Sequence, residues 1–150
     1  MEIISLVISI ISLVLSIILA IHSIYVYNKT VDHDKKKSTL DAFNLLQEQV
    51  LDKLNLYSIK EIKKISEDPH SEIYKEISGL LARIEHFSVG VNSKIYDIET
   101  LKRLAEKYFY ALYDKLLPII TKKRKINTSD KHYDEFEKLI KNIKGLYKNT

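Results

Sequence analysis

The chain has 150 residues, with 24 Lys and Arg against 20 Asp and Glu, and it has no Cys. A disulfide scaffold, a thiolate zinc site and a cysteine nucleophile are therefore excluded. The net charge of +4 is too small and too diffuse to predict nucleic-acid binding, and it suits an anionic membrane surface nearby. Only three Gly and two Pro occur, and the first of them is Pro69, so we expect an all-α fold.

The N-terminus carries a long apolar run, residues 3–27, without a charged Lys, Arg, Asp or Glu and without Gly or Pro. At about 1.5 Å per residue, a helix of this length reaches roughly 37 Å, against a hydrocarbon core of about 30 Å. A cleaved signal peptide would have a basic start, a shorter run and a small-x-small cleavage site, whereas here the acidic Glu2 precedes a longer run. We expect residues 1–27 to be an uncleaved, single-pass transmembrane anchor.

The segment that follows the anchor, residues 28–37, is polar and predicts a basic juxtamembrane linker or stalk. Four lysines lie in it and no Lys or Arg precedes the anchor, which by the positive-inside rule predicts an N-terminus outside and residues 38–150 in the cytoplasm, at the inner (cytoplasmic) membrane. These lysines are expected to contact lipid headgroups, at about 1 kcal/mol each near an anionic surface; they are Lys29, Lys35, Lys36 and Lys37.

Small residues recur through the anchor with a mean step of about 3.6, so they lie on one face of a helix. They are Ser5, Ser9, Ser12, Ser16, Ala20 and Ser23. The hydroxyls can bond the carbonyl one turn back, which would make the stripe incidental. The face can instead be a helix–helix interface, which we favour, because small residues let backbones approach closely. In a third hypothesis, several copies turn the serines toward a narrow wet pore.

Two helices are expected next. Ser38 or Thr39 is predicted to cap a helix from Leu40 to about Tyr57, and Ser58 with Glu61 has the spacing of a capping box that opens a short helix. Their predicted core residues are Phe43, Leu46, Val50, Leu54, Tyr57, Ile59, Ile62 and Ile65.

A central helix is predicted from Glu72 to about Val91, with Ser71 as its cap. Its apolar face is Ile73, Ile77, Leu80, Ile84, Phe87 and Val91. A second stripe predicts close packing of a neighbouring helix, and consists of Gly79, Ala82, His86 and Gly90. We interpret His86 as a packed, hydrogen-bonded histidine. Arg83 and Glu85 flank the apolar face, and either can pair with a neighbouring helix.

Asp97 is predicted to cap a further helix that Pro118 ends or kinks. Its core stripe is Ile98, Leu101, Leu104, Ala105, Tyr108, Leu112 and Leu116. The basic run Lys122, Lys123, Arg124 and Lys125 is interpreted as a solvated helix end, with phosphate or partner contact as the alternative. After a turn over residues 127–130, the last helix has a core face of Tyr133, Phe136, Leu139 or Ile140, Ile143 and Tyr147. The domain is thus expected to be a bundle of four longer helices and one short one.

No nucleotide-binding, zinc-hydrolase or serine-elbow motif occurs in the sequence, and no cofactor or metal is expected. An enzyme built around Arg83, Glu85 and His86 is the weakest hypothesis. Ten tyrosines fall mostly on the apolar stripes, so nucleic-acid binding is not expected.

Two stretches, LLARIEHFSVGVNSKIYDIETL and YDKLLPIITKKRK, carry a resemblance that covers roughly residues 72–125 together with the order of anchor and helices. Here the chain resembles small bacterial membrane-anchored proteins known only as domains of unknown function, and it is similar to phage abortive-infection membrane proteins. The resemblance implies a helical fold and a membrane effector, and it brings no catalytic residues.

The sequence therefore predicts a membrane-anchored, self-associating, non-enzymatic interaction protein, an effector or accessory in phage defence. One alternative is a membrane tether whose helical domain docks a cytoplasmic protein partner. The other is a pore-forming oligomer lined by serines. Membrane lipid and further copies of the chain are the expected partners.

Overall fold

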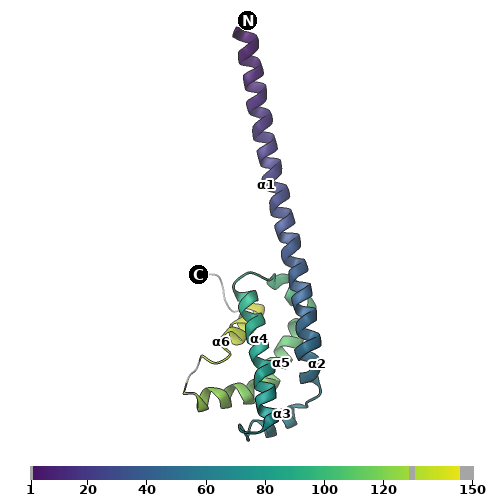
Figure 1. Ribbon diagram of the computed structural model, residues 1–150, viewed down its shortest axis with the longest axis vertical. Coiled ribbons are helices and arrows are strands. Elements are labelled where there is room, and N and C mark those ends of the chain that lie inside the picture. The colour runs from purple at the N-terminus through teal and green to yellow at the C-terminus, as the bar shows by residue number, and fades with distance from the viewer. Residues whose placement is uncertain (1, 129–130, 146–150) are drawn as a thin grey trace. The chain divides into compact units, whose positions relative to one another are not determined.

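A computed structural model describes residues 2–128 and 131–145, and this part of the chain contains helices and no strand (Figure 1). The all-α prediction is confirmed for these residues. The chain forms two compact units, Met1–Lys35 and Lys36–Thr150, here called the N-terminal unit and the helical domain. The first helix, α1 (Glu2–Leu46), provides the N-terminal unit and continues into the helical domain.

The N-terminal unit is a single helix whose side chains are exposed from residue 3 to residue 34. It is long and apolar enough to cross a membrane. Within this unit, large apolar side chains follow one another in an unbroken exposed run, whereas a soluble protein usually exposes them singly.

The helix start predicted at Ser38 or Thr39 is wrong, because α1 runs through both residues to Leu46. A capping residue acts only where the preceding backbone leaves the helix, and no Gly or Pro interrupts the helix here. Thr39 is fully buried, and its Oγ1 accepts a hydrogen bond of 2.7 Å from the backbone N–H of Asp97. Its hydroxyl therefore holds the start of a later helix.

A π-helix, η1 (Gln47–Leu51), follows α1 and leads into α2 (Asp52–Asn55). Four predicted core residues are buried between the end of α1 and α2, namely Phe43, Leu46, Val50 and Leu54. The sequence did not predict that Leu51 is buried as well. Adjacent buried pairs also occur in the regular helices, for example Leu80 with Leu81 and Leu139 with Ile140, so a stripe with one residue per turn misses the second member of each pair.

The short helix α3 (Ile59–Ile65) begins at the predicted capping box. The backbone N–H of Ser58 donates to the Glu61 carboxylate at 2.7 Å, and Ser58 Oγ accepts from the Glu61 N–H at 3.3 Å. The bond from the Ser58 backbone lowers the pKa of Glu61. Ile62 is fully buried, but the prediction for Ile59 is wrong, because its side chain is exposed.

The helix α4 (Glu72–Asn92) is central, as predicted, because it packs against α6, α5 and η1. Ser71 caps it by accepting a hydrogen bond of 3.3 Å from the Tyr74 N–H. Five of the six predicted core residues are buried, namely Ile77, Leu80, Ile84, Phe87 and Val91. Ile73 is exposed instead, and its neighbour Tyr74 is buried.

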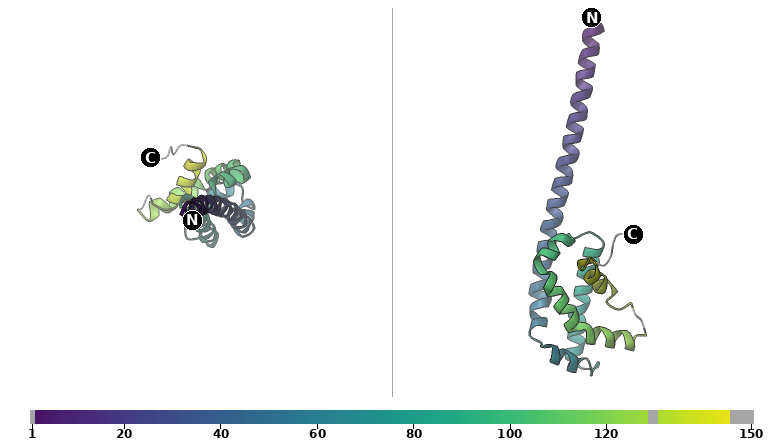
Figure 2. Two further views of the ribbon diagram at one scale, coloured as in Figure 1. Left: turned by 90° about the horizontal axis from the view of Figure 1, so that it is seen from above. Right: turned by 180° about the vertical axis from the view of Figure 1, so that it is seen from behind.

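The helix α5 (Ile98–Ile126) is capped by Asp97 as predicted, with a hydrogen bond of 2.9 Å from the Thr100 N–H. It does not end at Pro118 but continues for eight residues, and Figure 2 shows it bending along its course. Ala105 has a non-helical backbone (φ −149°, ψ 19°), which kinks the helix. The predicted core residues Leu101, Ala105, Leu112 and Leu116 are buried, but Leu104 is exposed, and Phe109 is buried although the predicted stripe did not include it.

Phe109 lies at the centre of the core. Its ring lies 6.2 to 6.4 Å, between centroids, from the rings of Phe43, Phe87, Tyr108 and Phe136. These rings come from α1, α4, α5 and α6, so one aromatic cluster joins the main helices of the domain.

The last helix is α6 (Asp134–Ile143), and its core face is confirmed by the buried residues Tyr133, Phe136, Leu139, Ile140 and Ile143. The predicted core residue Tyr147 and the end of the predicted turn at Asp130 lie outside the described residues. Figures 1 and 2 show that α4 and α5 run along the helical domain, while α3 lies at one end of it.

Candidate functional site

The small-residue face of α1 is exposed throughout. Ser9 Oγ donates to the carbonyl of Ser5 at 2.9 Å, and Ser16 Oγ donates to that of Ser12 at 2.8 Å. These are the bonds one turn back that the first interpretation expected. They use the donor of each hydroxyl and leave its oxygen able to accept from another helix.

The spacing of these hydroxyls extends past the apolar run. Ser9, Ser16, Ser23 and Thr30 lie seven residues apart, and Thr30 Oγ1 donates to the carbonyl of Val26 at 3.0 Å. A repeat of seven residues keeps one face of a helix against a partner helix in a left-handed pair. The hydroxyls therefore fit both interpretations: their bonds one turn back fit an incidental stripe, and their seven-residue repeat fits a helix–helix interface.

The predicted headgroup lysines differ in their surroundings. Lys29, Lys36 and Lys37 are exposed, whereas Lys35 is half-buried. Lys35 and Lys36 also interact with other groups of the chain. Lys29 and Lys37 are accordingly the two whose described surroundings leave the ammonium open to an anionic partner.

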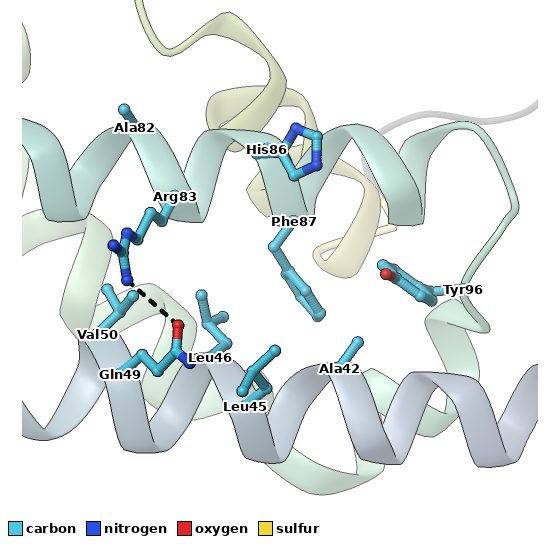
Figure 3. Close-up of a pocket in the computed structure, with 10 residues that line it drawn as sticks. All are labelled: Ala42, Leu45, Leu46, Gln49, Val50, Ala82, Arg83, His86, Phe87 and Tyr96. Atoms are coloured by element: carbon cyan, nitrogen blue, oxygen red, sulfur yellow. Dashed lines mark hydrogen bonds between the residues drawn. The ribbon is translucent and has the colours of Figure 1, made fainter.

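A groove lies in the helical domain between α4 on one side and the end of α1 with η1 on the other (Figure 3). Its volume is about 430 Å³. It is lined by Ala42, Leu45, Leu46, Gln49, Val50, Ala82, Arg83, His86, Phe87 and Tyr96. We call it the α1–α4 groove. Its lining is mostly apolar, and the ring of Phe87 stacks on that of Tyr96 with centroids 5.5 Å apart.

Arg83 is the strongest polar group of the α1–α4 groove. Its guanidinium donates a hydrogen bond of 3.2 Å to the side-chain oxygen of Gln49, as Figure 3 shows. Gln49 is neutral, and no carboxylate forms an ion pair with Arg83 in residues 2–128 and 131–145. The positive charge at the groove is therefore uncompensated in the described chain.

The second stripe of α4 does not pack under a neighbouring helix. A Cβ at Gly79 would meet no atom within 4 Å, and Ala82 and His86 are exposed. The prediction of a packed His86 is wrong, because this position faces the rim of the groove. Of the residues in this stripe, Gly90 is the one that another group approaches closely, because a Cβ there would lie 2.4 Å from Cε2 of Tyr96. The group that packs against Gly90 is thus the Tyr96 ring and not a neighbouring helix.

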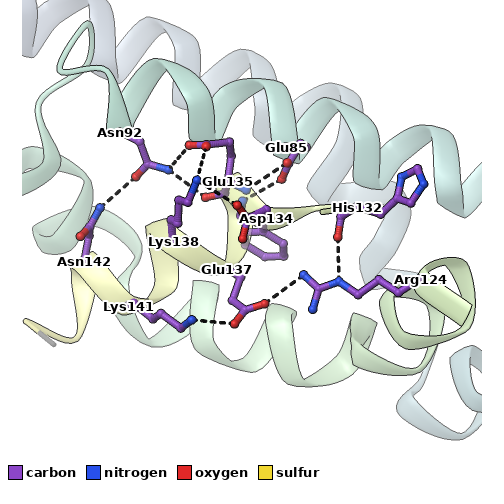
Figure 4. A network of polar contacts seen from close by, with 11 residues as sticks. Glu85, Asn92, Arg124, His132, Asp134, Glu135, Glu137, Lys138, Lys141 and Asn142 are labelled. Carbon is purple, nitrogen blue, oxygen red and sulfur yellow. Dashed lines mark hydrogen bonds and ion pairs between the residues drawn. The ribbon is translucent and has the colours of Figure 1, made fainter. Parts of the chain in front are cut away.

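The N-terminus of α6 is capped by a side chain from another helix (Figure 4). Tyr133 precedes α6 in the left-handed region, with φ of 62°, and provides no side-chain cap. Glu85 of α4 instead accepts hydrogen bonds from the backbone N–H groups of Glu135 at 3.0 Å and Phe136 at 2.7 Å. A carboxylate at a helix N-terminus is stabilised by the helix dipole. The expected pairing of Glu85 with a neighbouring helix is thus confirmed.

Asn92 extends the same network to the other side of α6. Its amide donates to the Glu135 backbone carbonyl at 2.9 Å and to the Glu135 carboxylate at 2.8 Å, and its oxygen accepts from Asn142 at 3.0 Å. Hydrogen bonds from Lys138 and Asn92 lower the pKa of Glu135. A lone polar residue near the end of a helix gives no sequence signal for such a contact, so the sequence interpretation missed Asn92.

The basic run at the end of α5 does not act as one cluster. Arg124 donates to the His132 carbonyl and to the Glu137 carboxylate, both at 2.9 Å, and so attaches the segment before α6 to α5 (Figure 4). Bonds from Lys141 and Arg124 lower the pKa of Glu137. Lys122 and Lys123 are half-buried, and Lys125 is exposed. Only part of the run is therefore open to phosphate or a partner.

Three hydroxyls lie together where α6 begins. Those of Tyr74 and Ser78 are buried without a hydrogen-bond partner in the described chain, and that of Tyr133 donates weakly to the Ser78 carbonyl at 3.4 Å. Burial raises the pKa of Tyr133 to about 12. These phenols are kept neutral and serve packing.

A family model described as Domain of unknown function (DUF4760) matches residues 3–143. The chain belongs to this family. The match spans the apolar run, the α1–α4 groove and α6, so the DUF4760 domain includes the N-terminal helix as well as the helical domain. No curated protein and no solved structure is similar enough to this DUF4760 chain to count as a match.

The residues of this DUF4760 chain that were considered for chemistry do not form a cluster in the part that the structure describes. Within the described ranges, no three His, Asp or Glu side chains are grouped so that they could hold a metal ion. Arg83, Glu85 and His86 do not converge, because Glu85 caps α6 while Arg83 and His86 line the groove on other faces of α4. What remains open is an apolar helix with a small-residue face and an apolar groove with one uncompensated cation.

Proposed function

We propose that this chain is a single-span membrane protein of the inner membrane that works by association with other proteins, without catalysis. One observation carries the proposal: the apolar side chains of residues 3–27 are exposed around the whole helix, and the domain shared by the family includes them. A bilayer removes that surface from water at roughly 25 cal/mol per Å². The basic segment that follows supports a cytoplasmic helical bundle and an outside N-terminus.

The small-residue face supports self-association through α1. In lipid, helices associate through close backbone approach and interhelical hydrogen bonds worth about 0.6 kcal/mol each. Ser9, Ser16 and Ser23 repeat every seven residues and present hydroxyl oxygens and small volume along one line. Several weak bonds along that line are enough for reversible pairing within the two dimensions of a membrane.

Energy transfer between labelled copies in liposomes tests this directly. Ser9→Leu combined with Ser16→Leu is expected to abolish energy transfer, because the larger side chains separate the backbones. Val7→Trp combined with Val14→Trp enlarges the opposite face by a similar volume and is the matched control. Equal energy transfer in both double variants would rule out association through the serine face.

A role in phage defence, as effector or accessory, rests on the sequence resemblance alone. It predicts that expression lowers phage plating and that Ser9→Leu with Ser16→Leu abolishes this protection. Phage plating that is the same with and without the protein would refute the role. A pore lined by serines further predicts release of a small dye from liposomes, and intact liposomes would exclude the pore while leaving pairing in place.

The α1–α4 groove favours a second candidate function, that of a membrane tether whose helical domain docks a cytoplasmic protein. An open apolar groove on a soluble domain is typical of a surface that another protein covers. Replacing residues 1–27 with an unrelated transmembrane helix separates the two candidates. A tether keeps its activity after the exchange, and a self-associating effector loses it.

A further inference from the structure

We infer that the α1–α4 groove binds an amphipathic helix of a partner protein, and that this helix carries an acidic residue which pairs with Arg83. The inference rests on the second candidate function, the docking of a cytoplasmic partner, and specifies the partner's chemistry. Leu45, which lines the groove, is 53% exposed, so part of the apolar lining faces water in the described chain.

The dimensions of the groove suit a helix. It follows α1 and η1 from Ala42 to Val50, which is about 12 Å at 1.5 Å per residue. Apolar side chains at i, i+3 or i+4, and i+7 of a bound helix span roughly 10.5 Å, and this is the usual pattern by which a helix binds in a groove. Helices form its two walls, and Figure 3 shows the ring of Phe87 between them and the ring of Tyr96 toward one end.

The wall of the groove contains the π-helix η1, with Gln49 and Val50 among the lining residues. A π-helix is less favourable than the α-helix it interrupts, and such turns are found frequently at functional sites. In this wall, Val50 and Leu51 are buried while Gln49 stays at the surface beside Arg83. The unusual turn thus positions the polar pair at the edge of an apolar surface.

Charge complementarity selects an acidic helix. The charge of Arg83 meets only the neutral amide of Gln49, and guanidinium has five N–H donors, most of which are left for a ligand. His86 lies on the same rim and is exposed. A carboxylate on a bound helix can accept two parallel hydrogen bonds from Arg83, which fixes the orientation of the helix as well as its charge.

The test uses the full chain in phosphatidylcholine nanodiscs and two fluorescent peptides. Both peptides are helical with leucine at i, i+4, i+7 and i+11, and they differ only in that the residues flanking this stripe are Glu in one and Lys in the other. Fluorescence anisotropy measures binding, with empty nanodiscs as the blank. The Glu peptide is expected to bind about tenfold more tightly than the Lys peptide, and Arg83→Glu is expected to reverse the order.

Leu45→Asn tests the apolar lining with little risk to the fold, because its side chain is half in water already. It is expected to weaken the Glu peptide about tenfold. Leu104→Asn, which changes a 46% exposed leucine of α5 outside the groove, is the matched control and is expected to leave binding unchanged.

Three results would overturn the inference: no binding of either peptide, equal binding of both, or an order that Arg83→Glu leaves unchanged. If Leu45→Asn instead changes the number of chains per nanodisc without peptide, the groove binds a second copy and the inference is wrong. The exchange of residues 1–27 tests the tether function separately. If the exchanged protein loses its activity, the tether function is wrong, but the peptide affinities measured here are unaffected.

Discussion

Replacing Gly90 with alanine is expected to destabilise the helical domain, whereas the same replacement at Gly79 is expected to stabilise it. Both glycines lie inside α4, so the gain in helix propensity, roughly 0.5 to 1 kcal/mol, is common to both. At Gly79 a Cβ meets nothing within 4 Å, so the gain remains. At Gly90 a Cβ would lie 2.4 and 2.7 Å from two ring carbons of Tyr96, which no real contact tolerates.

The ring of Tyr96 is not free to move away. Its backbone N–H donates to the carbonyl of Gly90 at 3.1 Å, and its ring stacks on Phe87. Displacing the ring forfeits about 0.5 to 1.5 kcal/mol of stacking and adds overpacking of about 1 to 3 kcal/mol. Less the gain in propensity, Gly90→Ala is expected to cost about 0.5 to 4 kcal/mol of unfolding free energy.

Thermal unfolding of the full chain in detergent micelles, followed by far-UV circular dichroism, measures both variants. At roughly 4 °C per kcal/mol for a domain of this size, Tm should fall by about 2 to 16 °C for Gly90→Ala and rise by about 2 to 4 °C for Gly79→Ala. In a Tyr96→Ala background, Gly90→Ala should lose its cost. Equal shifts at the two glycines, or a cost that persists without the Tyr96 ring, would refute the account of this contact.

Three further predictions concern the attachment of α6. Glu85→Ala removes two hydrogen bonds to the N-terminus of α6 and is expected to cost about 2 kcal/mol in chemical denaturation, whereas Glu76→Ala, on an exposed position of the same helix, should stay within about 0.5 kcal/mol. Arg124→Ala is expected to lower the free energy of unfolding by about 1 to 2 kcal/mol, because its contacts with His132 and Glu137 are lost. Lys125→Ala is the control and is expected to leave the free energy of unfolding nearly unchanged. Equal effects of the two substitutions would contradict the ion pair. Because burial raises the pKa of Tyr133 from 10.0 to about 12, folding favours the neutral phenol, so this group's contribution is complete below pH 10 and is lost as pH rises toward 12. Tyr133→Phe should therefore reduce the loss of stability in that range, and identical pH profiles for the two proteins would contradict the buried phenol.

Much of the secondary structure follows from the sequence, because its determinants are local. Ser58, Ser71 and Asp97 cap the helices that they were predicted to cap, since a short oxygen-bearing side chain before an apolar stripe needs nothing from the rest of the chain. Thr39 has the same chemistry but lies inside α1, where its hydroxyl bonds Asp97, which is 58 residues away. A contact over that distance leaves no local pattern.

Departures from regular helix geometry lie beside some of the errors in the predicted core, whereas the errors at Ile59 and Ile73 fall in regular helices. Leu51 lies in the π-helix, and Leu104 and Phe109 lie on either side of the non-helical backbone at Ala105. A stripe drawn at 3.6 residues per turn assumes that no such break occurs. The most central side chain of the core, Phe109, lies outside the predicted stripe.

Of the two candidate sites, one has a local sequence pattern and the other does not. The small-residue face lies on one regular helix, so its periodicity alone was sufficient to find it. The α1–α4 groove is formed by segments some 40 residues apart, and the pair Arg83 and Gln49 becomes visible only when α4 and η1 lie side by side. Gly90 was singled out correctly as a position of close approach, but the group that approaches is the Tyr96 ring.

The most direct test of the central proposal, association of α1 through its small-residue face in a membrane, is a cysteine cross-linking scan. Because the chain has no Cys, single cysteines can be introduced without any other change. In oxidised membrane vesicles, Ser9→Cys and Ser16→Cys are expected to give disulfide-linked dimers, while Val14→Cys and Ile18→Cys on the opposite face are expected to stay monomeric. Cross-linking that is equal at all four positions, or absent at both serines, would contradict the proposal.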